Sequence, residues 1–433
     1  MIEKLFNLIP QKFACFFEKH LKKIPYVKNK IDNEINGVMK DFETSLKPYK
    51  DTFQSHTHLP RTPIKRDEIL DQILEMNTRE EDKWKDGYVS GAVYHGNKDH
   101  IEFLNKVYAI TSQTNPLHSD LWPSASKFEA EIIEMTASML SSKKTDDPIC
   151  GTVTSGGTES ILLAMKTYRD FARVKQNIKK PELIVPVTAH AAFDKACQYF
   201  NIKMRHISVN EYFQADISQV KKAVNKNTIA IVGSAPSFPH GTIDPIEEMS
   251  EIALENHIGF HTDACLGGFV LPFAEKLGFD VPLFDFRLKG VTSMSADTHK
   301  YGYAAKGTSV IMYRGEELRH FQYYTATDWP GGLYFSPTYS RSRPGALSAA
   351  CWASLLSIGE KGYLTATRKI MDTADKIKQG INQIPELYIL GKPLWVIAFG
   401  AKKLNIYRVL DEMSQKGWSL NGLHKPSCVH IAI

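Results

Sequence analysis

The chain lacks the features that would place it in several specialised classes of protein. Its six cysteines are scattered through 433 residues without a Cys-x-x-Cys pair. This spacing argues against a disulfide framework or a structural zinc site and suits a reducing compartment. No run of about eighteen apolar residues is present, so we expect no membrane-spanning helix. We find no ordinary signal peptide, and a net charge of +5 is too slight to indicate nucleic-acid binding. We therefore predict a protein without a bound metal that is cytoplasmic, or peripheral on a membrane facing the cytosol.

The positive charge is concentrated at the N-terminus. Residues 1–50 hold ten lysines and six acidic residues. Within residues 1–30, Phe13, Phe16, Phe17 and Leu21 recur at near-helical spacing among lysines, which is typical of a basic amphipathic helix that lies on an anionic membrane. An arm that packs this aromatic face on the protein body or on a partner subunit is the alternative. We expect the arm to cover residues 1–58.

The middle of the chain alternates between strand-like and helical segments. Apolar strand-like runs occupy residues 183–187, 204–208, 229–233, 258–262, 291–296 and 309–313, and helical patterns occupy 191–200, 216–224 and 245–256. This alternation predicts an α/β domain with a mainly parallel sheet and right-handed crossovers. We place this large domain at residues 59–355 and a small α+β domain at 356–433, which we expect to continue past the last residue. Ligands of such sheets lie at the carboxyl ends of the strands.

A glycine-rich turn at residues 151–161 is a candidate phosphate cradle. A short strand runs into Ser155, Gly156, Gly157 and Thr158, and a helical pattern follows. Glycine lets backbone N–H groups approach an anion closely, and the start of a helix carries partial positive charge. The turn lacks both the P-loop lysine and the Gly-x-Gly-x-x-Gly spacing. An ordinary helix start capped by Thr158 is the alternative.

Three further polar residues follow predicted strands. Lys300 stands after the apolar run 291–296, where a lysine that loses part of its hydration becomes a nucleophile suited to a Schiff base. Asp263 follows another strand, and a buried acid there needs a cation such as a protonated pyridine nitrogen. The imidazole of His190 could stack on a flat ring. Each residue alone has an ordinary structural explanation, but the cradle, His190, Asp263 and Lys300 in this order form one constellation.

The same order resembles the fold-type I pyridoxal-phosphate enzymes and their group II decarboxylase branch, and within it the family of sphingosine-1-phosphate lyases. The resemblance extends from about residue 24 to the end of the chain. It is carried by Gly91-Ala92-Val93-Tyr94, Asn115-Pro116-Leu117-His118-Ser119-Asp120, residues 154–160, residues 189–195, residues 263–269 and residues 293–306. The loop at 115–120, dense in donors and acceptors, is also what a site-lining loop requires.

The resemblance implies a homodimer that binds pyridoxal 5'-phosphate in shared active sites. Lys300 would hold the cofactor, Asp263 its ring nitrogen and His190 its ring face. The cofactor phosphate would lie on Gly156, Gly157, Thr158 and His299, with Ser342 reaching over from the other subunit. A second anion pocket, for the substrate's own phosphate, would be formed by Tyr94, Asn115, His118 and Lys306.

The resemblance also implies a reaction. A lyase of this family cleaves the C2–C3 bond of sphingosine 1-phosphate, or of its dihydro form, by retro-aldol to a long-chain aldehyde and phosphoethanolamine. Lys300, Asp263, His190, Tyr94 and Lys306 would be its catalytic residues. The base at the C3 hydroxyl stays open among Lys306, a tyrosine and the substrate phosphate. The alternatives are a group II amino-acid decarboxylase and a non-catalytic membrane-binding scaffold.

Overall fold

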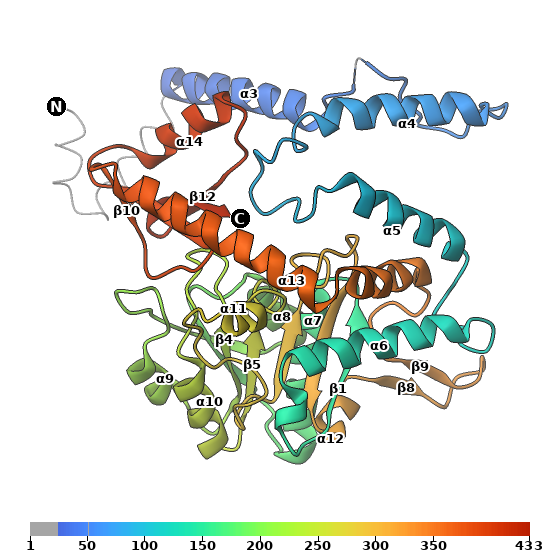
Figure 1. Ribbon diagram of the computed structural model, residues 1–433, viewed down its shortest axis with the longest axis vertical. Coiled ribbons are helices and arrows are strands. Elements are labelled where there is room, and N and C mark those ends of the chain that lie inside the picture. Colours follow the sequence, from blue (N-terminus) through green and yellow to red (C-terminus); the bar gives the residue numbers. More distant parts are fainter. Residues whose placement is uncertain (1–24, 51) are drawn as a thin grey trace. The chain divides into compact units, whose positions relative to one another are not determined.

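The computed structural model describes residues 25–50 and 52–433 (Figure 1). The chain divides into two compact units, Met1–Asp82 and Lys83–Ile433. The first unit contains helix α3 (Pro25–Leu46) and helix α4 (Arg66–Glu81), and the Tyr49 hydroxyl donates to Glu80 at 2.8 Å. Residues 1–24 of the predicted membrane-contacting arm lie outside the described residues. The domain boundaries that the sequence suggested, at residues 58 and 355, remain predictions.

The second unit is built on a seven-stranded sheet of order β1-β7-β6-β5-β4-β2-β3. Strands β2 to β6 run parallel, and β7 is antiparallel to both of its neighbours. The predicted strands between residues 182 and 313 all occur, with ends shifted by one or two residues. The strands are β1 (Ile149–Thr154), β2 (Glu182–Pro186), β3 (Lys203–Ile207), β4 (Thr228–Ser234), β5 (Gly259–Asp263), β6 (Ser293–Ala296) and β7 (Ser309–Arg314).

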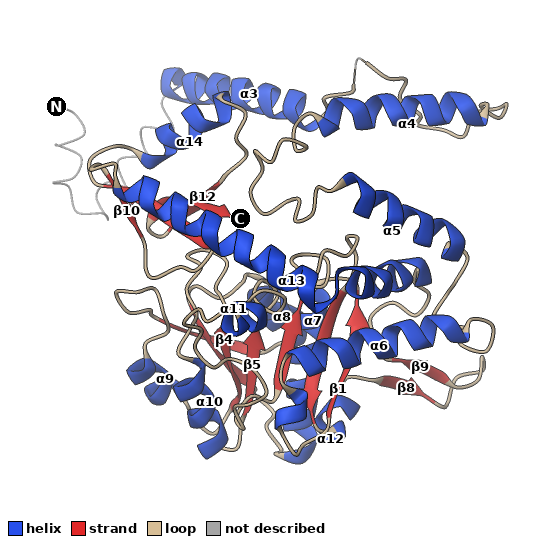
Figure 2. Cartoon of the chain, viewed as in Figure 1, coloured by secondary structure: helices blue, strands red, loops and turns tan. Residues whose placement is uncertain are grey.

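Successive side chains of a strand point to opposite faces of the sheet. Both faces of this sheet carry apolar side chains, and helices cover both. Ile184 and Ile231 join one buried cluster with residues of α6, α10, α11 and α13. Leu183 and Val232 join a second cluster with residues of α7, α8 and α12 on the opposite face. Figure 2 shows the red strands between the helices. The helices are α5 (Lys98–Thr111), α6 (Pro123–Met139), α7 (Gly157–Lys175), α8 (Ala192–Phe200), α9 (Ile217–Ala223), α10 (Ile246–Glu255), α11 (Leu271–Lys276), α12 (Glu316–His320), α13 (Gly345–Asn382) and α14 (Ile406–Gln415). The α/β architecture predicted from the sequence is confirmed.

A smaller antiparallel sheet of order β10-β11-β13-β12 follows helix α13. The end of β13 is bonded to two loops, since the N–H of Ala432 donates to Ser90 Oγ at 2.8 Å and the Tyr301 hydroxyl, in the turn after β6, donates to the Ile433 carbonyl at 2.7 Å. A two-stranded hairpin, β8 (Tyr324–Ala326) with β9 (Tyr334–Ser336), lies in the aromatic stretch 321–335. The small-sheet strands are β10 (Leu387–Ile389), β11 (Val396–Ala401), β12 (Asn421–His424) and β13 (Ser427–Ala432). Among the described residues, no helix combines the length and apolar character that crossing a bilayer requires.

Candidate active site

A pocket of about 420 Å³ lies at the carboxyl ends of β1, β2, β4, β5 and β6. This is the edge at which a mainly parallel sheet presents its ligands. The structure brings eight of the predicted site residues together in the lining of this pocket. They are Tyr94, Gly156, Gly157, Thr158, His190, Asp263, His299 and Lys300.

Lys300 is held by an acid that the sequence analysis did not single out. Its Nζ lies 2.8 Å from Asp297 Oδ2, and the Asp297 side chain is only 2% exposed. Burial acts to lower the pKa of Lys300, but attraction to Asp297 outweighs it and the pKa is raised. Burial likewise acts to raise the pKa of Asp297, yet Lys300 and His299 bring it below its ordinary value. Lys300 is therefore held as an ammonium group, and the expected desolvated, neutral amine is not what this pair of charges favours. The signal in the sequence was an acid three residues before the lysine.

Asp263 ends strand β5 and is 8% exposed. Its Oδ1 accepts hydrogen bonds from the Cys265 N–H at 3.1 Å and from Ser295 Oγ at 3.3 Å. A buried carboxylate is costly without a charged partner. The pocket that Asp263 faces can supply that partner as a bound cation.

His190 stands just before helix α8. Its Nδ1 accepts a hydrogen bond from the Ala192 N–H at 3.1 Å, so Nδ1 is not protonated and the neutral ring carries its proton on Nε2. The ring is exposed in the pocket, opposite Phe238, whose ring centroid lies 6.4 Å away. A flat imidazole fixed in this way fits the predicted stacking on a ring-shaped cofactor.

The glycine-rich turn leads directly into helix α7. A Cβ atom added at Gly157 would lie 2.7 and 2.8 Å from the Asp297 carboxylate oxygens and 2.9 Å from Cys265 Sγ, so only glycine fits. The alternative of a helix start capped by Thr158 is wrong, since the N-cap is Gly156 and no side chain caps it. Glu159 instead accepts from the Ser155 N–H at 2.6 Å. The donors at this helix start remain suited to an anion.

Tyr94 and Lys306 form one wall of a second, smaller hollow beside Lys300. Lys306 Nζ lies 4.5 Å from the centroid of the Tyr94 ring and donates to the His299 carbonyl at 3.2 Å. The hollow measures about 190 Å³ and is also lined by His299 and Lys300. Burial, with repulsion from Lys300, lowers the pKa of Lys306. An anion beside Lys306 would relieve this repulsion.

The remaining three predicted residues lie elsewhere. Neither hollow is lined by Asn115, His118 or Ser342 of the same chain. Asn115 Oδ1 accepts from the N–H groups of Leu117 at 3.0 Å and Arg343 at 3.4 Å. The loop that carries Asn115 and His118 therefore lies against the loop that carries Ser342.

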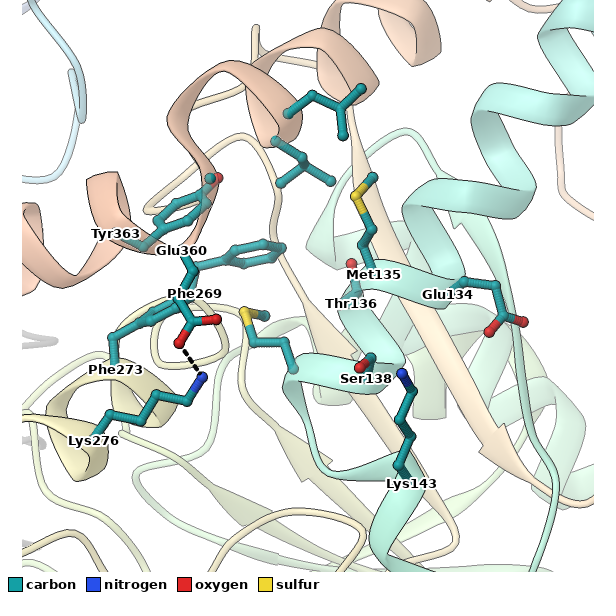
Figure 3. Close-up of a pocket in the computed structure, with 14 residues that line it drawn as sticks. Glu134, Met135, Thr136, Ser138, Lys143, Phe269, Phe273, Lys276, Glu360 and Tyr363 are labelled. Carbon is teal, nitrogen blue, oxygen red and sulfur yellow. Dashed lines mark hydrogen bonds and ion pairs between the residues drawn. The ribbon is translucent and has the colours of Figure 1, made fainter.

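A separate groove of about 540 Å³ lies between α6, α11 and α13, away from this chemistry (Figure 3). Phe269, Phe273 and Tyr363 line it together with two methionines and two leucines. The ion pair between Lys276 and Glu360, at 2.7 Å, lies at its side. None of the predicted site residues lines this groove.

The residues of the Lys300 pocket fit pyridoxal 5'-phosphate. The cofactor needs a lysine for its aldehyde, an acid for its ring nitrogen and an anion cradle for its phosphate. Lys300, Asp263 and the turn at Gly156 and Gly157 supply these three groups in one pocket. Within the described residues, no group of three or more His, Cys, Asp or Glu side chains could hold a metal ion.

Residues 48–400 match the family model described as the pyridoxal-dependent decarboxylase conserved domain. The fold and the lysine pocket thus define a chain of the pyridoxal-dependent decarboxylase class. A Lactobacillus brevis glutamate decarboxylase structure has a TM-score of 0.75 at 19% identity, covering 88% of this chain and 90% of that one. At that identity the likeness shows the fold alone.

Closer likeness is found to proteins of narrower function. A sphingosine-1-phosphate lyase of Arabidopsis thaliana is 46% identical over 446 residues, which cover 100% of this chain and 81% of the plant protein. Sphingosine-1-phosphate lyase 1 of Mus musculus is 43% identical, with 98% and 75% covered. The structure of a Burkholderia pseudomallei sphingosine-1-phosphate lyase has a TM-score of 0.88 at 42% identity, with 89% and 90% covered. The chain belongs to the sphingosine-1-phosphate lyase family, as its sequence motifs predicted.

Proposed function

We propose that this chain is a pyridoxal-phosphate-dependent lyase that cleaves the C2–C3 bond of phosphorylated sphingoid bases. The products are a long-chain aldehyde and phosphoethanolamine. The observation that carries this proposal is the pairing of two hollows around Lys300. One has the groups that a pyridoxal cofactor needs, and the other adds Lys306 and Tyr94, which suit a second phosphate.

The cofactor, when bound, accepts electrons from the breaking carbon–carbon bond into its protonated ring. Asp263 would hold the ring nitrogen, His190 would lie on the ring face, and the start of α7 with His299 would bind the cofactor phosphate. Lys300 is the attachment point and a candidate proton donor at C2. Asp297 keeps Lys300 directed into the pocket and charged when it is free.

The substrate phosphate is assigned to the hollow of Lys306 and Tyr94. An ammonium and a phenol are strong donors to a phosphate oxygen. The phenol can donate because burial raises the pKa of Tyr94 and keeps its proton in place. The base at the C3 hydroxyl stays open among Lys306, a tyrosine and the substrate phosphate itself.

We further propose that the active unit is a homodimer. Asn115 and His118 lie beside the loop of Ser342 through the Asn115–Arg343 hydrogen bond. This grouping is what a shared site requires, since the three residues would reach the partner subunit's Lys300 pocket as one block. Contact of residues 1–30 with a membrane remains a separate prediction.

Aldehyde release from sphingosine 1-phosphate by the cofactor-loaded protein tests the proposal. Lys300→Ala should abolish release, whereas Lys289→Ala, which changes an exposed lysine, should leave it intact. A wild-type protein that binds the cofactor and releases no aldehyde, but releases carbon dioxide from an amino acid, would support the decarboxylase alternative instead. A protein that binds no cofactor would support the scaffold alternative.

A further inference from the structure

Behind Asp263, four polar side chains form a continuous line of hydrogen bonds through the protein core. The Tyr168 hydroxyl lies 2.6 Å from Ser293 Oγ, and Ser293 Oγ lies 2.7 Å from His261 Nδ1. On the other side of the ring, His261 Nε2 lies 3.2 Å from Ser295 Oγ, which lies 3.3 Å from Asp263 Oδ1. No member before Asp263 is more than 2% exposed. The line therefore runs from helix α7 to the site without contact with water.

Strand geometry explains how this line is built. His261 and Asp263 are two residues apart on β5 and so share one face of the sheet, as do Ser293 and Ser295 on β6. The parallel register pairs His261 with Ser293 and Asp263 with Ser295. The four side chains thus alternate between the two strands on the face toward α7. Each serine stands within hydrogen-bonding reach of the histidine between them.

The identity of each donor follows by elimination. An ionised carboxylate only accepts, so Ser295 gives its single proton to Asp263 and must accept from His261 Nε2–H. A neutral imidazole has one N–H, so Nδ1 accepts, and Ser293 donates to it. Burial, against the attraction of Asp263, lowers the pKa of His261 to about 4, which keeps the ring neutral.

The far end of the line is Tyr168. Because Ser293 has given its proton to His261, it accepts from the Tyr168 hydroxyl. The Tyr168 hydroxyl also lies 2.7 Å from Thr292 Oγ1 and 3.0 Å from the Phe260 carbonyl. However, Thr292 Oγ1 itself donates to that carbonyl at 3.1 Å, and the 2.6 Å contact with Ser293 has no other proton. Every proton in the line therefore points toward Asp263.

A structural role alone does not require this composition. Central strands of parallel sheets are buried on both faces and are commonly apolar throughout. On the other face of the same two strands, Phe260 and Met294 are apolar and fully buried. A buried polar network is stabilising only when every member is satisfied, so an apolar replacement would be the simpler solution.

We propose that Ser295 and His261 are positioning residues that act on the cofactor through Asp263. This proposal rests on the proposed function only in that Asp263 holds the ring nitrogen. The Cys265 N–H and Ser295 Oγ both donate to Oδ1, which directs Oδ2 to the ring. Donors to a carboxylate favour its charged form, so the line keeps a proton on the ring nitrogen rather than on Asp263.

The test compares Ser295→Ala with the wild type, both loaded with cofactor labelled with ¹⁵N at the ring nitrogen. We expect Ser295→Ala to bind the cofactor, to move the ¹⁵N signal toward the unprotonated position and to lower kcat about tenfold or more, with little change in KM. Ser295→Thr, which keeps the hydroxyl, should restore the wild-type ¹⁵N signal and the wild-type kcat. Ser250→Ala, which changes a buried serine within α10, should change neither the ¹⁵N signal nor kcat.

An unchanged ¹⁵N signal in folded Ser295→Ala would overturn the proposal, whatever happens to activity. If Ser295→Ala does not fold, Tyr168→Phe tests the same line from its far end. It should shift the signal in the same direction by a smaller amount, and no shift would again overturn the proposal. The ¹⁵N readout needs no substrate, so a wild type that releases no aldehyde would refute the proposed function and leave this test in force.

Discussion

The Lys300 pocket and the groove between α6, α11 and α13 have similar volumes, about 420 and 540 Å³, but different contents. The pocket gathers an ammonium, two buried carboxylates, two histidines and a helix start at the ends of five strands. The groove gathers aromatic and aliphatic side chains from helices (Figure 3). Volume alone would not separate them. What distinguishes the pocket is a set of groups that are individually unfavourable in a protein interior.

The charges of the two regions differ in the same way. Asp297 and Lys300 are 2% and 23% exposed and are paired at 2.8 Å, so removing either partner leaves a charge in a poorly hydrated place. Lys276 and Glu360 at the groove are 53% and 63% exposed, and such a surface pair contributes little. The buried, paired charges therefore lie in the pocket, whereas the ion pair at the groove is exposed to solvent.

The largest effect expected on the groove side is that of Phe273→Ala. Phe273 is 4% exposed, and its ring stacks on that of Tyr363 with centroids 5.0 Å apart. Truncating a buried phenylalanine costs about 3–5 kcal/mol, so the free energy of unfolding in urea should fall by that amount. Phe103→Ala, at a 40% exposed position, is the matched control and should cost much less. Aldehyde release per folded molecule should not change. A large loss of that activity would show that the groove takes part in the reaction.

The sequence predicted the pocket side of this comparison far better than the groove side. Strand runs such as 229–233, with helical patterns between them, determine the sheet, and the sheet places Asp263, His190 and Lys300 at one edge. Local patterns suffice here because parallel strands align their carboxyl ends. The groove depends instead on how α13 bends at Gly359, where φ is 58°. No local pattern indicated that bend.

Within the pocket, the missed features are those that depend on three-dimensional pairing. Asp297 was visible in the sequence, but its bond to Lys300 depends on the turn after β6. The hydrogen-bond line behind Asp263 depends on the register between β5 and β6, which residue types alone do not give. The grouping of Asn115 with Arg343 joins residues far apart in the chain. Propensity and spacing describe one element at a time, whereas the last two of these features each join two elements.

On the pocket side, the substitution expected to weaken substrate binding is Lys306→Ala. Lys306→Ala removes a donor from the smaller hollow, and its bond toward the cofactor cradle ends on the backbone carbonyl of His299 and not on the His299 ring. A hydrogen bond to a charged group contributes about 1.5–3 kcal/mol, so KM for sphingosine 1-phosphate should rise by about tenfold to a hundredfold. The dissociation constant of the cofactor, measured by absorbance titration, should stay the same. If both constants weaken equally, Lys306 belongs to the cofactor site and its assignment to the substrate phosphate is wrong.

The smallest effect is expected where the two regions meet. The Tyr363 hydroxyl donates to the carbonyl of Gly302 at 2.8 Å, two residues after Lys300. Tyr363→Phe removes this bond, but Ser354 Oγ also donates to the same carbonyl at 3.3 Å. Because the acceptor keeps a partner, the free energy of unfolding should fall by only about 1 kcal/mol, with no change in cofactor affinity.

Combining Ser354→Ala with Tyr363→Phe tests whether the Gly302 carbonyl links the groove to the Lys300 loop. The double variant leaves the Gly302 carbonyl, in the loop that presents Lys300, without either of these side-chain donors. Its loss of stability should exceed the sum of the two single losses, because only the double variant leaves the buried acceptor unpaired. If cofactor affinity falls together with that stability, the groove supports the Lys300 loop through this carbonyl. If affinity is unchanged in the double variant, packing and chemistry are separate even at this carbonyl.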